Sequence, residues 1–269
     1  MLAVLVGIFG HPYIDLEPYL DLAGLDEVDE EVCLGLTQVS PDYTGGSHRS
    51  MGIVPPSRPD NAYADYGEVL RAMGPRHFAT FRKLADDPSA FPPDVPRDQI
   101  GEERAVPLSR RQMLWLEVRF GVYFPWKVYF ELMPNTYWGE KRIPKPWSRT
   151  AEAVFPKTLA FVRSLPLESI GRCNIMGLRA NDHGTVHRDG EPPEQVEPDP
   201  FITLCPRANK RLFLWDESRK EKTEVRGRAY WFNDFDYHGV EADPFFRYSI
   251  RVDGTFQPAF LARVRAGVS

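Results

Sequence analysis

The stretch FNDFDYHGVEADPFFRYSIRVD, residues 232–253, contains the clearest structural pattern in the sequence. In an extended chain, its last seven residues would place Arg247, Ser249 and Arg251 on one face and larger, mostly apolar residues on the other. This alternation predicts a β-strand with one face against a hydrophobic core. His238 precedes Arg247 by nine residues, so an imidazole is expected near this strand.

Several other short segments of the C-terminal half have the same character. They are rich in β-branched and aromatic residues and are separated by turn-forming residues, which is typical of strands. No helical pattern lies between them, so a β-sandwich, jelly roll or barrel is expected. The predicted strands cover residues 173–178, 201–205, 211–215, 228–232 and 246–252.

The first half of the chain has mainly helical patterns. Ser109 and Gln112 form a capping box ahead of RRQMLWLEVRF, and Gly121 is a natural end for that helix. Pro156 begins or kinks another helix, because proline lacks the amide that a helix interior needs. The predicted helices cover residues 62–73, 75–86, 110–120 and 148–165.

These patterns predict one α+β domain over residues 1–269. Residues 1–165 form a mainly helical part, which buttresses a β-core over residues 166–260. The length and the hydrophobic fraction of 42% suffice for a well-buried core. The sequence contains no internal repeat. No stretch with the composition of a linker separates the two parts.

The composition excludes several classes of protein. A net charge of -5 argues against a nucleic-acid-binding surface, and the three scattered cysteines indicate neither a zinc knuckle nor a disulfide framework. The apolar MLAVLVGIFG, residues 1–10, is too short to span a membrane and lacks the basic start of a signal peptide. We expect it to be a buried strand in a cytoplasmic protein without a membrane partner. No pattern indicates an oligomeric state.

The stretch NDHGTVHRDG, residues 181–190, supplies candidate metal ligands. His187 and Asp189 are two positions apart, so an extended segment projects both to the same side. With His238 they give two imidazoles and one carboxylate, which can occupy three corners of an octahedron and leave three positions open. His183 is the alternative histidine of this stretch, and the nearby Asp182 is expected to form a turn, as are Asp234 and Asp236.

The predicted strand that starts at Arg247 offers an anchor for a carboxylate. An arginine can bind a carboxylate with two parallel hydrogen bonds, and the hydroxyl of Ser249 lies on the same face. A metal at one end and this arginine at the other fit a dicarboxylate such as 2-oxoglutarate. Arg251 shares that face and stays an alternative anchor. Asn174 and Thr203 are further polar positions that can face the interior of the core.

The order His187-x-Asp189, His238 and Arg247-x-Ser249 resembles the 2-oxoglutarate- and Fe(II)-dependent dioxygenases over roughly residues 160–255. Residues 232–253 look like the corresponding part of the aspartyl/asparaginyl β-hydroxylase and prolyl or proline hydroxylase branches. The resemblance implies a double-stranded β-helix, of the jelly-roll or cupin-like kind. It also implies Fe(II) on the three ligands and a C5 carboxylate on Arg247, assisted by Ser249. Because Asp189 is present, the chain is closer to the proline hydroxylases and unlike the related halogenases.

By this resemblance, the chain is expected to hydroxylate a C–H bond of an amino acid or of a residue in a peptide. O2 and 2-oxoglutarate would be consumed, and succinate and CO2 released. The same iron chemistry could instead give desaturation, epoxidation or ring closure, because the outcome depends on how the substrate lies. An alternative from another class is a non-catalytic cupin-like protein that binds a ligand or a metal.

Overall fold

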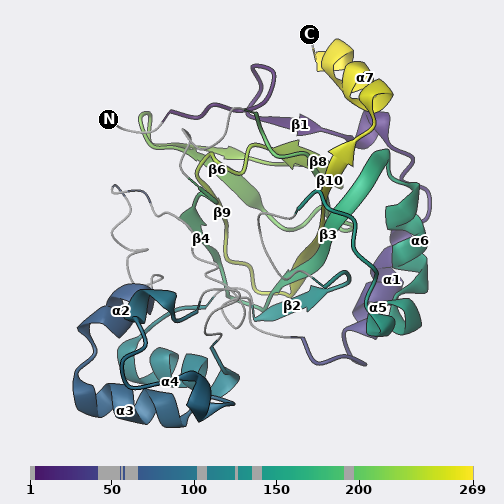
Figure 1. Ribbon diagram of the computed structural model, residues 1–269. Helices are drawn as coiled ribbons and strands as arrows, with labels where there is room; N and C mark the ends of the chain where they lie inside the picture. Colours follow the sequence, from purple (N-terminus) through teal and green to yellow (C-terminus); the bar gives the residue numbers. More distant parts are fainter. Residues whose placement is uncertain are drawn as a thin grey trace.

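The computed structural model describes residues 4–41, 55, 57, 66–101, 108–124, 127–134, 141–190 and 197–268. Within these ranges the chain forms two antiparallel β-sheets, with helices on one side and a separate group of helices at one corner (Figure 1). None of the helices in this part of the chain has the length and hydrophobicity needed to cross a membrane. The mixed helical and antiparallel character predicted from the sequence is confirmed.

The two sheets together form the β-core. The larger sheet has the order β1-β8-β5-β10-β3-β2 and the smaller has the order β4-β9-β6-β7. All five predicted strands are present, as β3, β5, β6, β8 and β10. The strands cover Tyr13–Asp15 (β1), Val128–Glu131 (β2), Leu167–Leu178 (β3), Gly184–His187 (β4), Phe201–Leu204 (β5), Leu212–Asp216 (β6), Glu221–Glu224 (β7), Ala229–Phe232 (β8), His238–Val240 (β9) and Arg247–Phe256 (β10).

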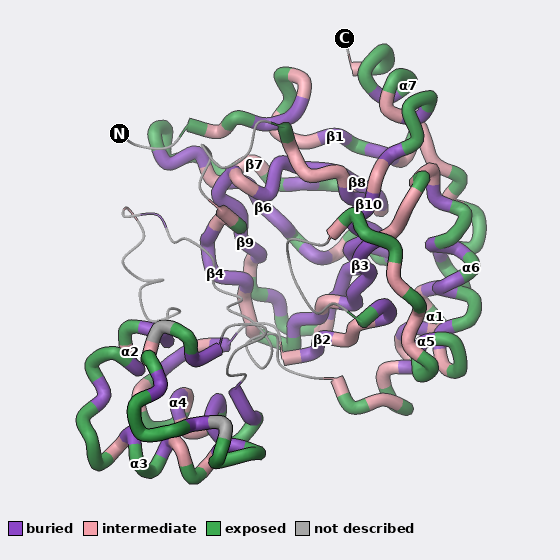
Figure 2. The backbone as a smooth tube through the Cα atoms, in the orientation of Figure 1, coloured by how far each residue is buried: buried purple, intermediate pink, exposed green. Residues whose placement is uncertain are grey.

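The long strand β10 lies at the centre of the larger sheet, between β5 and β3. Both β10 and β3 are buried along most of their length (Figure 2). Arg251 is opposite Thr203 on β5 and Asn174 on β3, so these three polar residues share one face. That face is turned toward the smaller sheet, because Arg251 reaches Asp189, which follows β4. The polar interior predicted from the alternation is therefore present.

The opposite face of the larger sheet is covered by helices. Tyr248 on β10 donates a hydrogen bond from its hydroxyl to Asp29 on α1 at 2.8 Å. Ile250 and Val252 belong to the same buried hydrophobic cluster as residues of α1 and α6. Figure 1 shows α1, α5 and α6 beside β3. The bounds are Leu25–Gly35 (α1), Arg149–Val154 (α5), Pro156–Ser164 (α6) and Pro258–Val268 (α7), with short 3-10 helices at Glu17–Tyr19, Pro88–Ala90 and Arg97–Gln99.

Three further helices pack mainly on one another. The hydrophobic residues of α2 (Tyr66–Ala72), α3 (Pro75–Lys83) and α4 (Arg110–Phe120) form a second buried cluster, separate from that of the β-core. Ser109 caps α4 as expected: its hydroxyl accepts from the Gln112 amide at 3.1 Å, while the Gln112 side chain accepts from the Ser109 amide at 2.9 Å. Helices α1, α5 and α6 thus pack against the β-core, whereas α2–α4 form a separate hydrophobic core.

The ends of the predicted helices differ in detail. Pro156 begins α6 and so separates it from α5, which divides the predicted 148–165 helix in two. Gly121 ends α4 with a φ of 69°, a left-handed conformation that glycine adopts without steric cost. Of the predicted 62–73 helix, residues 62–65 lie outside the described residues.

The prediction of a buried strand at the N-terminus is wrong for the described residues 4–10. Val4 and Val6 are 59% and 67% exposed, and Gly7 and Gly10 have φ values of 68° and 83°. The chain turns at Phe9 and Gly10, where Ile8 and His11 exchange backbone hydrogen bonds of 2.8 and 2.9 Å. Just before this turn, Asp236 accepts hydrogen bonds from the amides of Val6 and Gly7 at 2.8 and 2.7 Å. Apolar composition alone predicted a strand, since the distant carboxylate that binds these amides is not visible locally.

Candidate metal centre

The three predicted ligands come together at the edge of the smaller sheet. His187 ends β4, His238 begins β9, and the register of these antiparallel strands places the two residues opposite each other. Asp189 Oδ1 lies 3.6 Å from Nε2 of His187 and 3.9 Å from Nε2 of His238. The three donor atoms lie within 4.8 Å of one another, which is close enough to hold one metal ion.

Both imidazoles are oriented by backbone carbonyls. Nδ1 of His187 donates to the carbonyl of Thr185 at 2.7 Å, and Nδ1 of His238 donates to that of Asp236 at 2.9 Å. A carbonyl can only accept, so the proton of each neutral ring belongs on Nδ1. Each Nε2 then presents a lone pair toward Asp189. This is the tautomer that a metal-binding histidine needs, and a partner on the other nitrogen is typical of such ligands.

The charge states also suit a metal ion. Burial, together with the nearby His187, lowers the pKa of His238 to about 3, so this imidazole is neutral at neutral pH. Burial alone would raise the pKa of Asp189, but the neighbouring His238, Arg251, His187 and Lys141 hold it below its usual value. Two imidazole nitrogens and one carboxylate oxygen are the donor set of a non-haem Fe(II) site.

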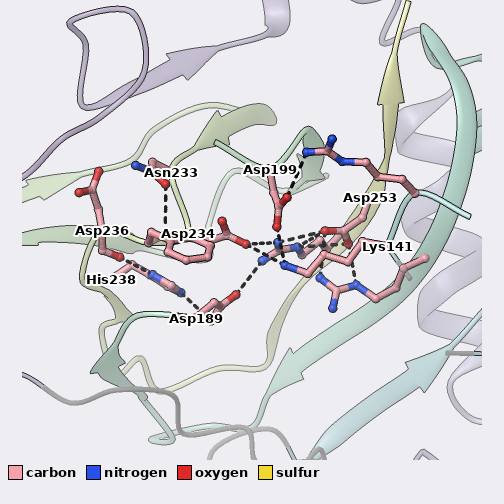
Figure 3. Close-up of polar contacts among 12 residues, drawn as sticks. Lys141, Asp189, Asp199, Asn233, Asp234, Asp236, His238 and Asp253 are labelled. Atoms are coloured by element: carbon pink, nitrogen blue, oxygen red, sulfur yellow. Dashed lines mark hydrogen bonds and ion pairs between the residues drawn. The ribbon is translucent and has the colours of Figure 1, made fainter. Parts of the chain in front are cut away.

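A buried network of charged side chains lies directly behind Asp189 (Figure 3). Arg251 binds Asp189 and Asp234 and also contacts Asp253. Asp234 is fully buried, and burial raises the pKa of its carboxyl. Lys141 connects Asp234 to Asp199, at 3.4 and 2.8 Å. Asp234 was expected only to form a turn, so its place in this network is new information from the structure.

The proposed carboxylate anchor lies on the same inner face, next to a residue that sequence reasoning missed. Lys210, which precedes β6, is 6% exposed and donates from Nζ to the hydroxyl of Ser249. Arg247 is fully buried and donates to the backbone carbonyls of Asp182 and Glu241, with Asp243 3.6 Å from its Nε. Lys210 gave no signal in the sequence, because only the pairing of distant strands brings it to Ser249.

The alternative ligand His183 lies away from the three donor atoms. Its ring stacks on that of Tyr123, with 4.6 Å between ring centroids, and its amide donates to the Tyr123 hydroxyl at 2.9 Å. Among the described residues, the group that could hold a metal comprises His187, Asp189 and His238, without His183. Because Tyr123 follows α4, this contact also connects the α2–α4 cluster to the loop before β4.

Several buried polar atoms on the inner face of the larger sheet have no hydrogen-bond partner in the described part of the chain. They include Oδ1 of Asn174 on β3 and the hydroxyl of Tyr230 on β8. Thr203 lies opposite Tyr230, so all these groups share the face that carries Arg251. A buried polar atom without a partner is costly unless a ligand or water satisfies it. These atoms give the inner face a polar lining that water or a ligand can satisfy.

No protein-family profile and no curated protein sequence matches this chain. Similar solved structures include a prolyl-4-hydroxylase of Pseudomonas putida, with 13% identity over 41% of this chain and 66% of that one, at a TM-score of 0.25. A 2OG-Fe(II) oxygenase family protein of Burkholderia pseudomallei shows 12% identity over 48% of this chain and 70% of that one, at 0.31. A Trichoplax adhaerens prolyl hydroxylase, solved with a hypoxia inducible factor peptide, shows 14% identity over 48% of this chain and 68% of that one, at a TM-score of 0.29.

These solved structures are named as prolyl hydroxylases or as a 2OG-Fe(II) oxygenase family protein. The likeness covers less than half of this chain in each case, and the TM-scores are low. It therefore assigns no activity to this chain.

Proposed function

We propose that this chain is an Fe(II)- and 2-oxoglutarate-dependent oxygenase, which hydroxylates a C–H bond of an amino acid or of a residue in a peptide. The observation that carries the proposal is the convergence of Nε2 of His187, Nε2 of His238 and Oδ1 of Asp189. Both imidazoles are in the metal-binding tautomer. These residues would hold Fe(II) and leave three positions for the co-substrate and O2.

The strand order supports a double-stranded β-helix as the scaffold. Between β3 and β10, the strands β3, β5, β8 and β10 lie in the larger sheet, whereas β4, β6, β7 and β9 lie in the smaller one. The chain therefore passes between the two sheets as it proceeds, and the side chains of both inner faces meet. This arrangement brings ligands from β4 and β9 opposite the polar face of β10.

We assign the distal carboxylate of 2-oxoglutarate to Lys210 and Ser249, with Arg247 as the second cation at that end. A buried ammonium beside a hydroxyl can bind a carboxylate strongly, because little water competes there. Much of the Arg247 guanidinium is engaged by backbone carbonyls, which favours Lys210 for the direct contact. The bound iron and co-substrate would supply the oxidation: O2 and 2-oxoglutarate are consumed, C–H becomes C–OH, and succinate and CO2 leave.

Co-substrate binding is expected to weaken as the pH rises from 7 to 9. Burial, with Arg251 and Arg247 nearby, lowers the pKa of Lys210 to about 8, so the ammonium loses its charge within this range. If the bound dicarboxylate needs the charged form, the Kd of 2-oxoglutarate rises by roughly tenfold. Titrations of Mn²⁺-loaded protein measure this. Lys210→Met should bind more weakly at pH 7 and show a flatter pH dependence, and equal behaviour of both proteins would contradict the assignment.

The direct test of the proposed function is turnover of purified protein supplied with Fe(II), 2-oxoglutarate and O2. Succinate formation that requires added Fe(II) is expected, stimulated by amino acids or peptides that fit the site. Mass spectrometry of the product separates the outcomes, because hydroxylation adds one oxygen whereas desaturation removes two hydrogens. Binding of a metal and 2-oxoglutarate without succinate across a wide substrate panel would favour the non-catalytic alternative.

A further inference from the structure

The carboxylate of Asp189 belongs to a residue outside the β-strands, so strand pairing does not fix its position. Asp189 follows the end of β4 by two positions, and its residue as a whole is exposed, although its side chain is only 19% exposed. One backbone hydrogen bond, from its amide to the carbonyl of Asp234 at 2.9 Å, holds the main chain. The orientation of the carboxylate must therefore come from side-chain contacts.

The two oxygens of Asp189 have different neighbours. Oδ1 faces the imidazoles of His187 and His238, at 3.6 and 3.9 Å. Oδ2 faces Nη1 of Arg251, at 3.3 Å. The guanidinium thus occupies one oxygen and leaves the other to the metal site. A metal ion placed between the three donor atoms meets Oδ1, because Oδ2 is already engaged by a positive group that repels the ion.

Arg251 is itself held in place. It lies in the middle of β10, and its side chain is 9% exposed. Nη2 binds the buried carboxylate of Asp234, Nε binds Asp253 at 3.0 Å, and the guanidinium carbon lies 3.9 Å from the centre of the Phe201 ring. Asp234 therefore contacts both Asp189, through its carbonyl, and Arg251, through its carboxylate. The three residues form a closed triangle of contacts, and Figure 3 shows the side chains of Asp189 and Asp234 that belong to it.

We propose that Arg251, fixed by Asp234, is a positioning residue that makes Asp189 a one-oxygen ligand of the metal. This inference rests on the proposed function. A carboxylate that binds through both oxygens takes two coordination positions, whereas one that binds through a single oxygen takes one. With two histidines, only the one-oxygen mode leaves three positions of an octahedron open. Arg251 thereby preserves the vacancies that a chelating co-substrate and O2 require.

The same geometry decides between the two roles open to Arg251. As an anchor for the co-substrate it would need free donors directed into the interior. Its Nε, Nη1 and Nη2 each contact a carboxylate of the protein, namely Asp253, Asp189 and Asp234. The hydrogen bonds of Arg251 are therefore used by Asp189 and by the buried carboxylates of Asp234 and Asp253. The role of anchoring the co-substrate stays with Lys210, Ser249 and Arg247.

The test compares Mn²⁺ binding to the wild type and to Arg251→Lys, without turnover. Electron paramagnetic resonance of free Mn²⁺ gives the Kd, and water-proton relaxation gives the number of water molecules on the bound ion. Lysine keeps the positive charge but lacks the planar fork that contacts several carboxylates at once. We expect Arg251→Lys to raise the Kd by about 10- to 100-fold, as for other partners of metal ligands, or to carry one bound water fewer.

The matched control is Arg172→Lys. Arg172 is as deeply buried and binds Asp253 at 2.7 and 2.9 Å, but no contact joins it to Asp189 in the described part of the chain. Its replacement should lower thermal stability yet leave the Kd and the water number at wild-type values. A purely structural role of Arg251 would give the same pattern for both variants.

The outcomes separate this proposal from the proposed function. Wild-type Kd and water number in folded Arg251→Lys overturn the positioning role while the function stands. If Arg251→Lys does not fold, Asp234→Asn decides instead, because it removes the anion that holds Arg251. Asp234→Asn should likewise raise the Kd for Mn²⁺ or lower the number of bound water molecules. Wild-type values in this variant overturn the proposal. A wild-type protein that binds no Mn²⁺ overturns both.

Discussion

His238→Ala and Asp189→Ala are expected to abolish metal-dependent turnover. Each removes one of the three donor atoms that lie within 4.8 Å of one another, and two remaining donors bind a divalent ion weakly. The Kd for Fe(II) or Mn²⁺ should rise by about 100-fold or more, and succinate formation should fall to background. Thermal unfolding of both variants is the control for folding, because His238 is buried against Phe232 and Asp189 binds Arg251.

His183→Ala is the matched control for these variants. It removes a histidine from the same stretch, four residues before His187, whose ring stacks on Tyr123. We expect metal affinity within about threefold of the wild type, because the carbonyls of Thr185 and Asp236, and not His183, are the partners that orient the two ligand imidazoles. If His183→Ala lost the metal and His187→Ala kept it, the assignment of the histidine ligand would be reversed. Isothermal titration with Mn²⁺ at pH 7 measures all of these variants on one scale.

Much of the candidate centre could be predicted because its residues obey local rules. The spacing of His187 and Asp189 predicted that they share a side, and they do, although Asp189 lies in a bend just after β4. The alternation after Arg247 gives the polar face of β10. What could not be predicted depends on pairing between strands far apart in the chain. Lys210 meets Ser249 across 39 residues. No local pattern indicates such a contact.

The role of Arg251 shows the same limit. Its place on the strand face was correctly predicted, but its partners Asp189 and Asp234 were not, because both are fixed by turns between strands. The two sheets give these turns their positions only once the whole β-core has formed. For the N-terminal residues the limit is sharper. Apolar composition favoured a strand, whereas the carboxylate of Asp236, 229 residues from Gly7, binds the Gly7 amide in an irregular segment.

Asp253→Ala is expected to destabilise the fold strongly. Asp253 is 1% exposed and accepts hydrogen bonds from both Arg172 and Arg251. Its removal leaves two buried guanidinium groups without this anion. Breaking a buried pair in this way costs about 3–5 kcal/mol of unfolding free energy. Urea denaturation of metal-free protein at pH 7 measures the loss.

Arg172→Met should cost less than Asp253→Ala, because Asp253 keeps its contact with Arg251. The reverse order would show that the interactions of Arg172, and not those of Asp253, dominate the energy of the pair. An exposed pair serves as the control: Arg226 and Glu224 are 80% and 49% exposed, so Arg226→Met should leave the unfolding free energy unchanged within error.

The pH dependence of stability gives an independent check on the role of Asp253, through a comparison of the wild type with Asp253→Asn. Burial alone would raise the pKa of Asp253, but Arg172 and Arg251 outweigh it and hold the pKa below its usual value. Because the folded-state pKa is the lower one, the stabilisation is complete above the unfolded-state value of about 3.9 and is lost as the pH falls through the folded-state value. The difference in stability between wild type and Asp253→Asn should therefore be constant near neutral pH and shrink below about pH 4. A difference that does not change down to pH 3 would mean that the carboxylate charge contributes little, and that Asp253 acts mainly through its shape and hydrogen bonds.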